Sequence, residues 1–179
     1  MRTWTRRDAL WLGAGVLTSG CGYALAGRGN SLPASIVTIG VPQFVNQSTI
    51  PDIERVLTDA VRAELQTKRR YRILPDETGV DALFVGRVLN VVLQPSAFTS
   101  QNQVSRNLII ATASVEFTEV QASRVIWANP SFQVRDEFDV TTGRSSNDPR
   151  ALFEQDANAL DRLARSFARS VVTSIFEAF

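Results

Sequence analysis

Two stretches with helical spacing of apolar residues enclose a run of strand patterns, and this order most constrains the fold. Residues 51–65 place Ile53, Leu57 and Val61 on one face, and residues 149–175 repeat the pattern with leucine, phenylalanine and valine. Each helix therefore needs an apolar surface to cover. A mostly antiparallel sheet of four to five strands supplies that surface if both amphipathic helices pack on one face. The sequence predicts an α+β, two-layer sandwich.

Alternation of apolar and polar residues indicates the strands of this sheet. We expect them at residues 35–44, 71–74, 81–93, 107–119 and 125–140, with polar loops at 95–106 and 141–147. Asn129-Pro130 predicts a bulge or break, because proline cannot donate a hydrogen bond to a neighbouring strand. The strand at 81–93 is apolar on both faces, which indicates either an interior strand covered on both sides or a face left for a partner.

The first twenty residues have the three parts of an export signal. A basic start with Arg2, Arg6 and Arg7 is followed by an apolar stretch at 9–17 and by small residues at 18–20. The apolar stretch is shorter than the roughly 20 residues that a membrane-spanning helix needs. The paired arginines resemble a twin-arginine signal, and the export route, Sec or twin-arginine, stays open. We expect residues 1–20 to be cleaved off.

Cys21 ends this signal pattern and is the only cysteine of the chain. Ser19-Gly20-Cys21 resembles the lipobox of bacterial lipoproteins, in which the cysteine becomes the first residue and carries acyl chains such as palmitate. Thr18 departs from the leucine that lipoboxes favour, and a buried free cysteine after an uncleaved helix is the alternative. We expect a lipidated tether at 21–34 and a single domain at 35–179. Gly22, in place of Asp, is typical of lipoproteins sorted to the outer membrane.

Composition excludes several functions. The chain has no histidine and one cysteine, so a Cys–His or Ser–His–Asp catalytic site and an intrachain disulfide are excluded, and a zinc site nearly so. Removal of residues 1–20 takes away three arginines and one aspartate, which leaves 16 basic and 17 acidic residues and a net charge of −1. Such a domain lacks the broad basic face that nucleic acid requires. We predict a non-enzymatic protein without a cofactor.

Binding residues are therefore sought outside catalytic motifs. Arg106 and Arg144 lie in the two predicted polar loops, where arginines can bind anionic groups such as phosphorylated sugars. Plain solubility of the loops is the alternative. Lys68, Arg69 and Arg70 follow the first helix; we interpret them as C-terminal capping cations, with phosphate binding as the alternative.

Three acidic residues near the end of the last strand raise the question of a metal site. Asp136, Glu137 and Asp139 carry ligands that Ca²⁺ accepts. Strand alternation places Glu137 and Asp139 on one face and Asp136 on the other, so we interpret them as a solvated sheet edge and predict no metal site.

Several of these stretches together resemble a known family. Cys21-Gly22-Tyr23-Ala24-Leu25, then Leu32-Pro33 leading into residues 36–44 and Asn46, then the helix at 51–65, are similar to LptE-type lipopolysaccharide-assembly lipoproteins. The order of elements matches that family through to the terminal helix.

The resemblance implies a non-catalytic role at the outer membrane. Members of the family are anchored at its periplasmic face and plug a large β-barrel partner, LptD, which they help to assemble while lipopolysaccharide is placed in the outer leaflet. Arg106 and Arg144 are then the candidates for lipopolysaccharide contact. The alternative is a periplasmic lipoprotein that activates or adapts a cell-wall synthase or a secretion channel, since small α+β lipoprotein domains serve there too.

Overall fold

The computed structural model describes residues 32–139, 148–155 and 157–178. In order, its elements are β1 (Thr38–Gly40), β2 (Val45–Asn46), α1 (Ile53–Thr67), β3 (Arg72–Leu74), β4 (Ala82–Phe98), β5 (Val104–Glu119), β6 (Arg124–Asp139), α2 (Pro149–Gln155) and α3 (Ala157–Glu177). Cys21, the export signal pattern and the predicted loop at 141–147 lie outside the described residues.

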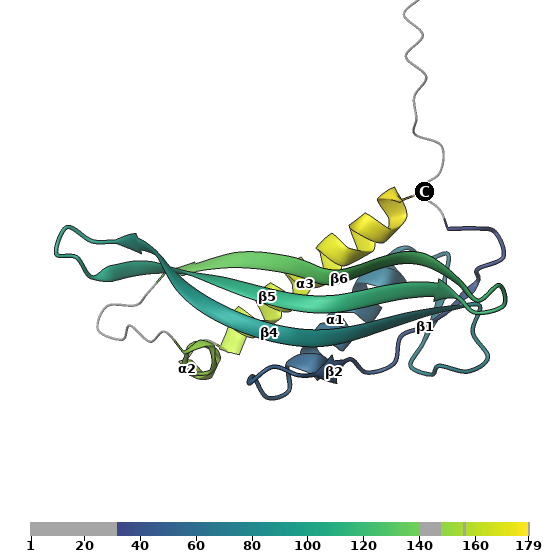
Figure 1. Ribbon diagram of the computed structural model, residues 1–179, viewed down its shortest axis with the longest axis horizontal. Helices are drawn as coiled ribbons and strands as arrows, with labels where there is room; N and C mark the ends of the chain where they lie inside the picture. Colours follow the sequence, from purple (N-terminus) through teal and green to yellow (C-terminus); the bar gives the residue numbers. More distant parts are fainter. Residues whose placement is uncertain (1–31, 140–147, 156, 179) are drawn as a thin grey trace, which may run out of the picture.

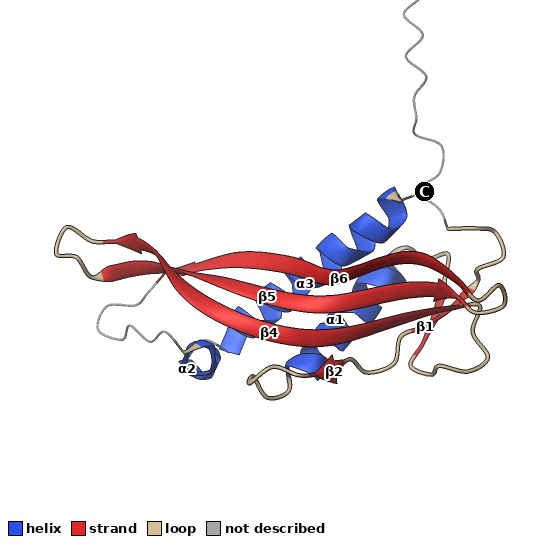
Figure 2. Cartoon of the chain, viewed as in Figure 1, coloured by secondary structure: helices blue, strands red, loops and turns tan. Residues whose placement is uncertain are grey.

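The two long helices, α1 and α3, lie side by side on one side of the sheet (Figure 1, Figure 2). They run parallel: Val56 near the start of α1 and Leu160 near the start of α3 line the same groove, while Lys68 after α1 lies over the Phe176 ring near the end of α3. The predicted α+β two-layer sandwich, with its helices on one face, is confirmed.

The sheet is mixed, and its described part has six strands where four to five were expected. Its order is β3-β1-β4-β5-β6, and β2 pairs with β4 beyond β1. The long strands β4, β5 and β6 form two antiparallel pairs, whereas β1, β2 and β3 pair in parallel. The antiparallel part dominates, as predicted, because the three long strands follow one another through short turns.

The strand predicted at residues 35–44 is interrupted. Only β1 and β2 form, and they pair with different parts of β4, at Ala82 and at Arg87. Between them lies Pro42, which has no N–H to donate to a neighbouring strand. Gly40 is required where the chain leaves β1, since a Cβ atom there would clash with the carbonyl oxygen of Asp76.

The loop predicted at residues 95–106 is mostly strand. β4 continues to Phe98 and β5 begins at Val104, so only residues 99–103 turn the chain. Asn102 closes this turn with φ of 60°. The loop was predicted because Pro95 cannot donate a hydrogen bond to a neighbouring strand. Past Asn90, however, β4 pairs with β5 alone, and proline is tolerated on such an edge. We call residues 94–106 the hairpin arm; it reaches beyond the helices (Figure 1).

The other boundaries differ in smaller ways. The predicted break at Asn129-Pro130 is confirmed as a bulge, because the one residue of β5 between Ala113 and Val115 faces two residues of β6, Pro130 and Ser131. The first helix begins at Ile53 rather than at 51, after Asp52 with φ of 61°. The single terminal helix expected from 149 is divided into α2 and α3.

Aromatic rings form the centre of the core between helices and sheet. Phe84 packs against both Phe44 and Phe117, with ring centroids 5.8 and 6.3 Å apart, and Phe167 of α3 packs against Phe44 and Phe132 at 6.3 and 5.6 Å. Gly86 lets the Phe44 ring approach β4, because a Cβ atom there would lie within 2.7 Å of three ring carbons.

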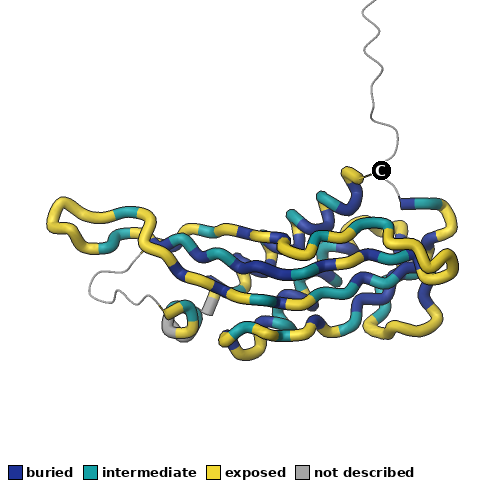
Figure 3. Tube along the Cα trace, viewed as in Figure 1, coloured by how far each residue is buried: buried dark blue, intermediate teal, exposed yellow. Residues whose placement is uncertain are grey.

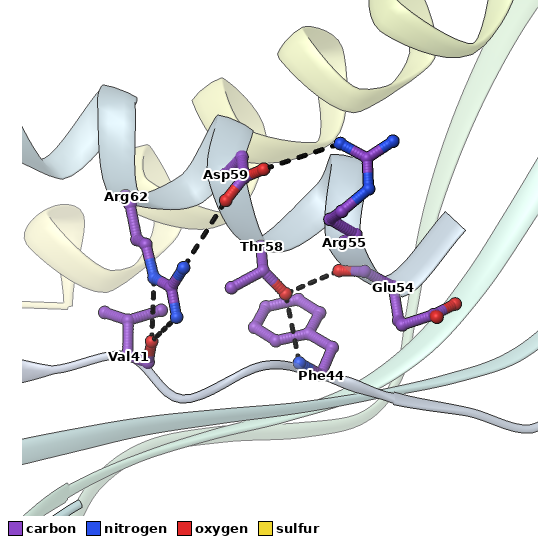
Figure 4. Close-up of polar contacts among 7 residues, drawn as sticks. All are labelled: Val41, Phe44, Glu54, Arg55, Thr58, Asp59 and Arg62. Carbon is purple, nitrogen blue, oxygen red and sulfur yellow. Dashed lines mark hydrogen bonds and ion pairs between the residues drawn. The ribbon is translucent and has the colours of Figure 1, made fainter. Parts of the chain in front are cut away.

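Polar contacts tie α1 to the segment between β1 and β2 (Figure 4). The buried Thr58 hydroxyl accepts a hydrogen bond from the Phe44 N–H at 3.0 Å. Arg62 donates from both Nε and Nη2 to the Val41 carbonyl oxygen, at 2.9 and 2.7 Å. This segment cannot use a strand partner throughout, so the side chains of α1 satisfy its backbone groups instead.

Candidate functional site: the open sheet face and the hairpin arm

The face of the sheet opposite α1 and α3 has no described helix on it (Figure 2). Residues directly opposite each other in the antiparallel register share a face, so the rows Val92–Ile110–Arg135 and Asn90–Thr112–Gln133 belong to this face. We call it the open face, and it comprises Leu83, Val85, Arg87, Asn90, Val92, Gln94, Ala97, Arg106, Leu108, Ile110, Thr112, Ser114, Glu116, Thr118, Val125, Ala128, Gln133, Arg135, Glu137 and Asp139.

The open face is apolar along its middle and polar along the second half of β6, from Gln133 to Asp139. Val92 is 39% exposed, and Leu83, Val85, Leu108 and Ile110 are half-buried. The tube in Figure 3 shows this alternation of buried and accessible residues along the strands. Of the two interpretations of the apolar strand at 81–93, the structure favours the face left for a partner, since in the described part of the chain only neighbouring strand side chains shield it.

Apolar exposure continues on the hairpin arm. Phe98 is 57% exposed and stands opposite Val104 at the end of the β4–β5 pair. The turn beyond it is polar and is closed by backbone hydrogen bonds, from Thr99 N to Gln103 O at 2.7 Å and from Asn102 N to Thr99 O at 3.0 Å. The arm thus presents an aromatic side chain on a hydrogen-bonded scaffold.

Arg106 lies on β5 within the arm rather than in a loop, and it points to the open face. Its Nε donates to Asp139 Oδ1 at 3.0 Å and its Nη1 to Glu137 Oε2 at 3.2 Å. The hydrogen bond to Asp139 and the two negative charges raise the pKa of the Arg106 guanidinium above its ordinary value. Its side chain keeps 47% of its surface exposed. The second predicted contact residue, Arg144, lies outside the described residues.

The acidic residues of β6 are divided between two faces, as predicted. Glu137 and Asp139 face Arg106 on the open face, whereas Asp136 pairs in register with Ile109 on the helix side. Within the described residues no group of three possible metal ligands occurs. The arrangement is an ion-paired strand edge.

Two carboxylates that the sequence did not single out hold the segment before β1. Asp81 Oδ2 accepts hydrogen bonds from the N–H groups of Val37 and Thr38 and from the Thr38 hydroxyl, at 2.8–3.0 Å. These bonds, with the backbone N–H of Thr38 first, lower the Asp81 pKa. Glu119 accepts from the Ser35 hydroxyl at 2.9 Å, and this bond, with one from Arg124, lowers the Glu119 pKa.

A shallow groove runs along the helix layer on the side away from the sheet. At its wider part, a hollow of about 330 Å³, it is lined by Arg55, Asp59, Asp161 and Arg165. This hollow carries charges of both signs, two arginines and two aspartates. No helix in the described residues has the length and apolar character to cross a membrane.

The open face and hairpin arm are thus the candidate binding surface. A family model described as "LptE: Lipopolysaccharide-assembly" matches residues 36–175. The chain belongs to this LptE lipopolysaccharide-assembly family, a family of non-catalytic bacterial lipoproteins, and the expectation that it is not an enzyme is confirmed by this membership. No curated protein matches the sequence.

Solved structures show remote similarity. Rare lipoprotein B from Shewanella oneidensis is 14% identical, with 76% of this chain and 95% of that chain covered at a TM-score of 0.40. A minor lipoprotein from Acinetobacter baumannii is 12% identical, with 79% and 94% covered at 0.43. PelC from Paraburkholderia phytofirmans is 14% identical, with 82% and 94% covered at 0.45. The family assignment rests on the family model alone.

Proposed function

We propose that the chain is an outer-membrane lipoprotein that plugs and helps to assemble a β-barrel lipopolysaccharide translocon of the LptD type. In this role it supports insertion of lipopolysaccharide into the outer leaflet. Family membership supports the part in lipopolysaccharide assembly. The observation that carries the barrel partnership is the open face, a long, partly apolar sheet surface that no described helix covers. Barrel wall packed on that face would bury Val92 and its neighbours.

The proposed organisation places the anchor at one end of the molecule. Residues 1–20 act as a cleaved export signal, Cys21 carries the acyl chains, residues 21–34 form the tether and residues 35–179 form the domain. Leu32 is only 2% exposed, so the folded core includes a residue three positions before the expected domain start. The hairpin arm lies at the opposite end of β4 from this point of entry (Figure 1).

Arg106 and Arg144 are the proposed contacts for lipopolysaccharide. For Arg106 this contact is an exchange: a lipid phosphate takes the place of Glu137 and Asp139 on the guanidinium. Neutralising those two carboxylates with Glu137→Gln and Asp139→Asn should therefore tighten lipopolysaccharide binding, whereas Arg106→Gln should weaken it. Equal binding by all three variants would remove Arg106 from the contact.

Co-purification tests the barrel partnership. The full chain, tagged and extracted in mild detergent, should recover one β-barrel protein whose gel mobility changes on heating. Recovery of a peptidoglycan synthase or a secretion channel would favour the adaptor function instead. Recovery of neither class would contradict both.

The anchor has its own test. Cys21→Ala should release the domain from the membrane fraction while its circular dichroism spectrum and unfolding midpoint stay those of the parent chain. Mass spectrometry of the parent protein should find acyl chains on Cys21. Unmodified Cys21 in the parent, or continued membrane retention of the variant, would contradict acylation as the anchor.

A further inference from the structure

The basic residues after α1 lie where the chain enters the described domain. The Leu32 N–H donates to Tyr71 Oη at 3.2 Å, and the Tyr71 ring packs against Phe176 with centroids 5.7 Å apart. Lys68 Nζ lies 5.4 Å from the centroid of the same Phe176 ring. We call the surface around these residues the Tyr71 end. It joins the entry of the chain to the C-terminal ends of both long helices.

Four exposed cations belong to this end, namely Lys68, Arg69, Arg70 and Arg72. None of the four forms an ion pair with a carboxylate of the described residues. Their side chains are not needed to cap α1, because the backbone N–H groups of Lys68 and Arg69 donate to the carbonyls of Leu65 and Gln66. In contrast, other cations of α1 are paired, with Arg55 and Arg62 both near Asp59. The sequence-based interpretation as side-chain caps is therefore incomplete.

One exposed apolar side chain borders the cations, and a second lies farther along the same end of the sheet. The Arg72 N–H donates to the Val37 carbonyl at 2.8 Å, and Val37 is 57% exposed. Val120 is 41% exposed, and its N–H donates to the carbonyl of Asp81, whose carboxylate binds the N–H of Val37. Cations beside exposed aliphatic groups suit a bilayer surface, where the charges meet headgroups and the apolar groups enter the interface.

We propose that the Tyr71 end is a membrane-contact surface that binds anionic phospholipid headgroups of the bilayer holding the anchor. The proposal rests on the proposed acylation of Cys21. From Cys21 to Leu32 the chain has eleven steps, which reach at most about 40 Å, so the Tyr71 end cannot leave the neighbourhood of the bilayer. The tip of the hairpin arm lies roughly 50 Å further along β4 at about 3.3 Å per residue. Binding at the Tyr71 end therefore directs the arm away from the anchoring leaflet.

Lys68 allows a direct test, because it is the only lysine of the chain. The lipidated protein is reconstituted in vesicles of phosphatidylcholine alone or with added phosphatidylglycerol, and the rate at which a water-soluble amine reagent labels Lys68 is measured by mass spectrometry. Phosphatidylglycerol should slow labelling several-fold at about 0.1 M salt and much less at about 1 M, where charges are screened within about 3 Å. Equal rates in both kinds of vesicle at low salt would overturn the proposal.

A second measurement does not depend on the anchor. In the described part of the chain all core residues lie between Leu32 and Phe176. A chain from Gly22 onward keeps every one of them, and its partition onto phosphatidylglycerol vesicles can be measured by sedimentation. The triple variant Lys68→Ala, Arg69→Ala, Arg70→Ala should lose roughly fivefold in partition for each cation removed. A matched triple at exposed arginines elsewhere, Arg55→Ala, Arg150→Ala and Arg165→Ala, should partition like the parent chain.

The outcomes separate this proposal from the proposed function. If both triple variants lost the same amount of partition onto vesicles, the binding would depend on net charge alone. That result would overturn the proposal of a specific surface at the Tyr71 end. Slowing of Lys68 labelling by inorganic phosphate alone, or by lipopolysaccharide but not by phosphatidylglycerol, would assign the cations to another ligand and also overturn it. If the lipidated protein fails to stay with vesicles, the anchor is wrong, and the partition assay still decides whether the Tyr71 end binds phospholipid.

Discussion

Arg62 of α1 donates two hydrogen bonds to the carbonyl oxygen of Val41, from Nε at 2.9 Å and from Nη2 at 2.7 Å. Val41 is fully buried, and its neighbour Pro42 has no N–H, so the strand network cannot serve this stretch on its own. Replacing Arg62 with Met should leave a buried carbonyl without its donors and lower the free energy of unfolding by about 1–3 kcal/mol. Arg55→Met, at a side chain 62% exposed, is the matched control and should change stability by less than about 0.5 kcal/mol in urea titrations.

Arg62→Lys refines this prediction. Lysine keeps the charge but offers a single ammonium in place of the planar guanidinium. The free energy of unfolding of Arg62→Lys should therefore lie between those of the parent chain and Arg62→Met. If Arg62→Met were as stable as the parent chain, the two hydrogen bonds from Arg62 to the Val41 carbonyl would not stabilise the fold.

Gly86 should tolerate no side chain while Phe44 keeps its ring position. In Gly86→Ala the new methyl group meets three ring carbons at 2.6–2.7 Å, so overpacking should cost about 1–3 kcal/mol. The double variant Gly86→Ala, Phe44→Leu should cost less than the sum of its two single variants, because the smaller side chain removes the clash. Additive losses in thermal unfolding would place the strain elsewhere.

Asp81 should make stability depend on pH in acid. Its pKa is lowered in the folded state from an ordinary value of 3.8 by hydrogen bonds from Thr38 and Val37, so the ionised group stabilises the fold above that value and loses this contribution as the pH falls through the folded pKa. Asp81→Asn should lower the urea midpoint at pH 7 and flatten the decline below pH 3.8. An unchanged acid decline in the variant would assign that decline to other carboxylates.

A charge on the open face should interfere with partner binding but not with folding. Val92 is 39% exposed on that face, so Val92→Asp should unfold near the parent midpoint while recovering less of the barrel partner in detergent extracts. Thr173→Asp, at an exposed residue of α3, is the control and should recover the barrel normally. Equal recovery by the two variants would remove the open face from the barrel interface.

Phe98 should contribute to binding more than to stability. Its ring is 57% exposed at the end of the arm, so Phe98→Ser should change the free energy of unfolding by less than about 0.5 kcal/mol. The same variant should reduce recovery of the barrel, because an exposed aromatic side chain on a hydrogen-bonded hairpin contributes most once it is buried by a partner. A large loss of stability would instead show that Phe98 stabilises the folded domain itself.

Periodicity predicted the architecture because each element buries one face. The apolar spacing of α1 and α3 and the alternation in β5 carry enough information to place helices and strand on opposite sides of one core. The strand at 35–44 could not be placed correctly, since its interruption depends on Arg62 and Thr58, which lie on a helix later in the chain. When side chains from a distant helix replace hydrogen bonds between strands, the sequence of the strand itself shows no pattern that would predict it.

Only part of the candidate site could be predicted from the sequence. Arg106 was found because arginines beside polar residues suggest anion binding, but its carboxylate partners lie 31 and 33 residues away, across a register that the sequence does not state. Pro95 and the polar residues after it made the arm look like a loop. The grouping of Lys68 with Leu32 depends on Phe176 at the end of the chain and could not be seen in any single stretch.

The position of β1 has a mechanical consequence. This first strand after the proposed tether lies between β3 and β4, parallel to both. A force transmitted through the anchor pulls β1 along its own axis, so the hydrogen bonds on both sides, with the Asp81 and Glu119 contacts before them, are loaded together in shear rather than opened one at a time. With the proposed anchor, the domain is held to the membrane through a strand whose geometry resists being peeled from the sheet when the anchored leaflet moves.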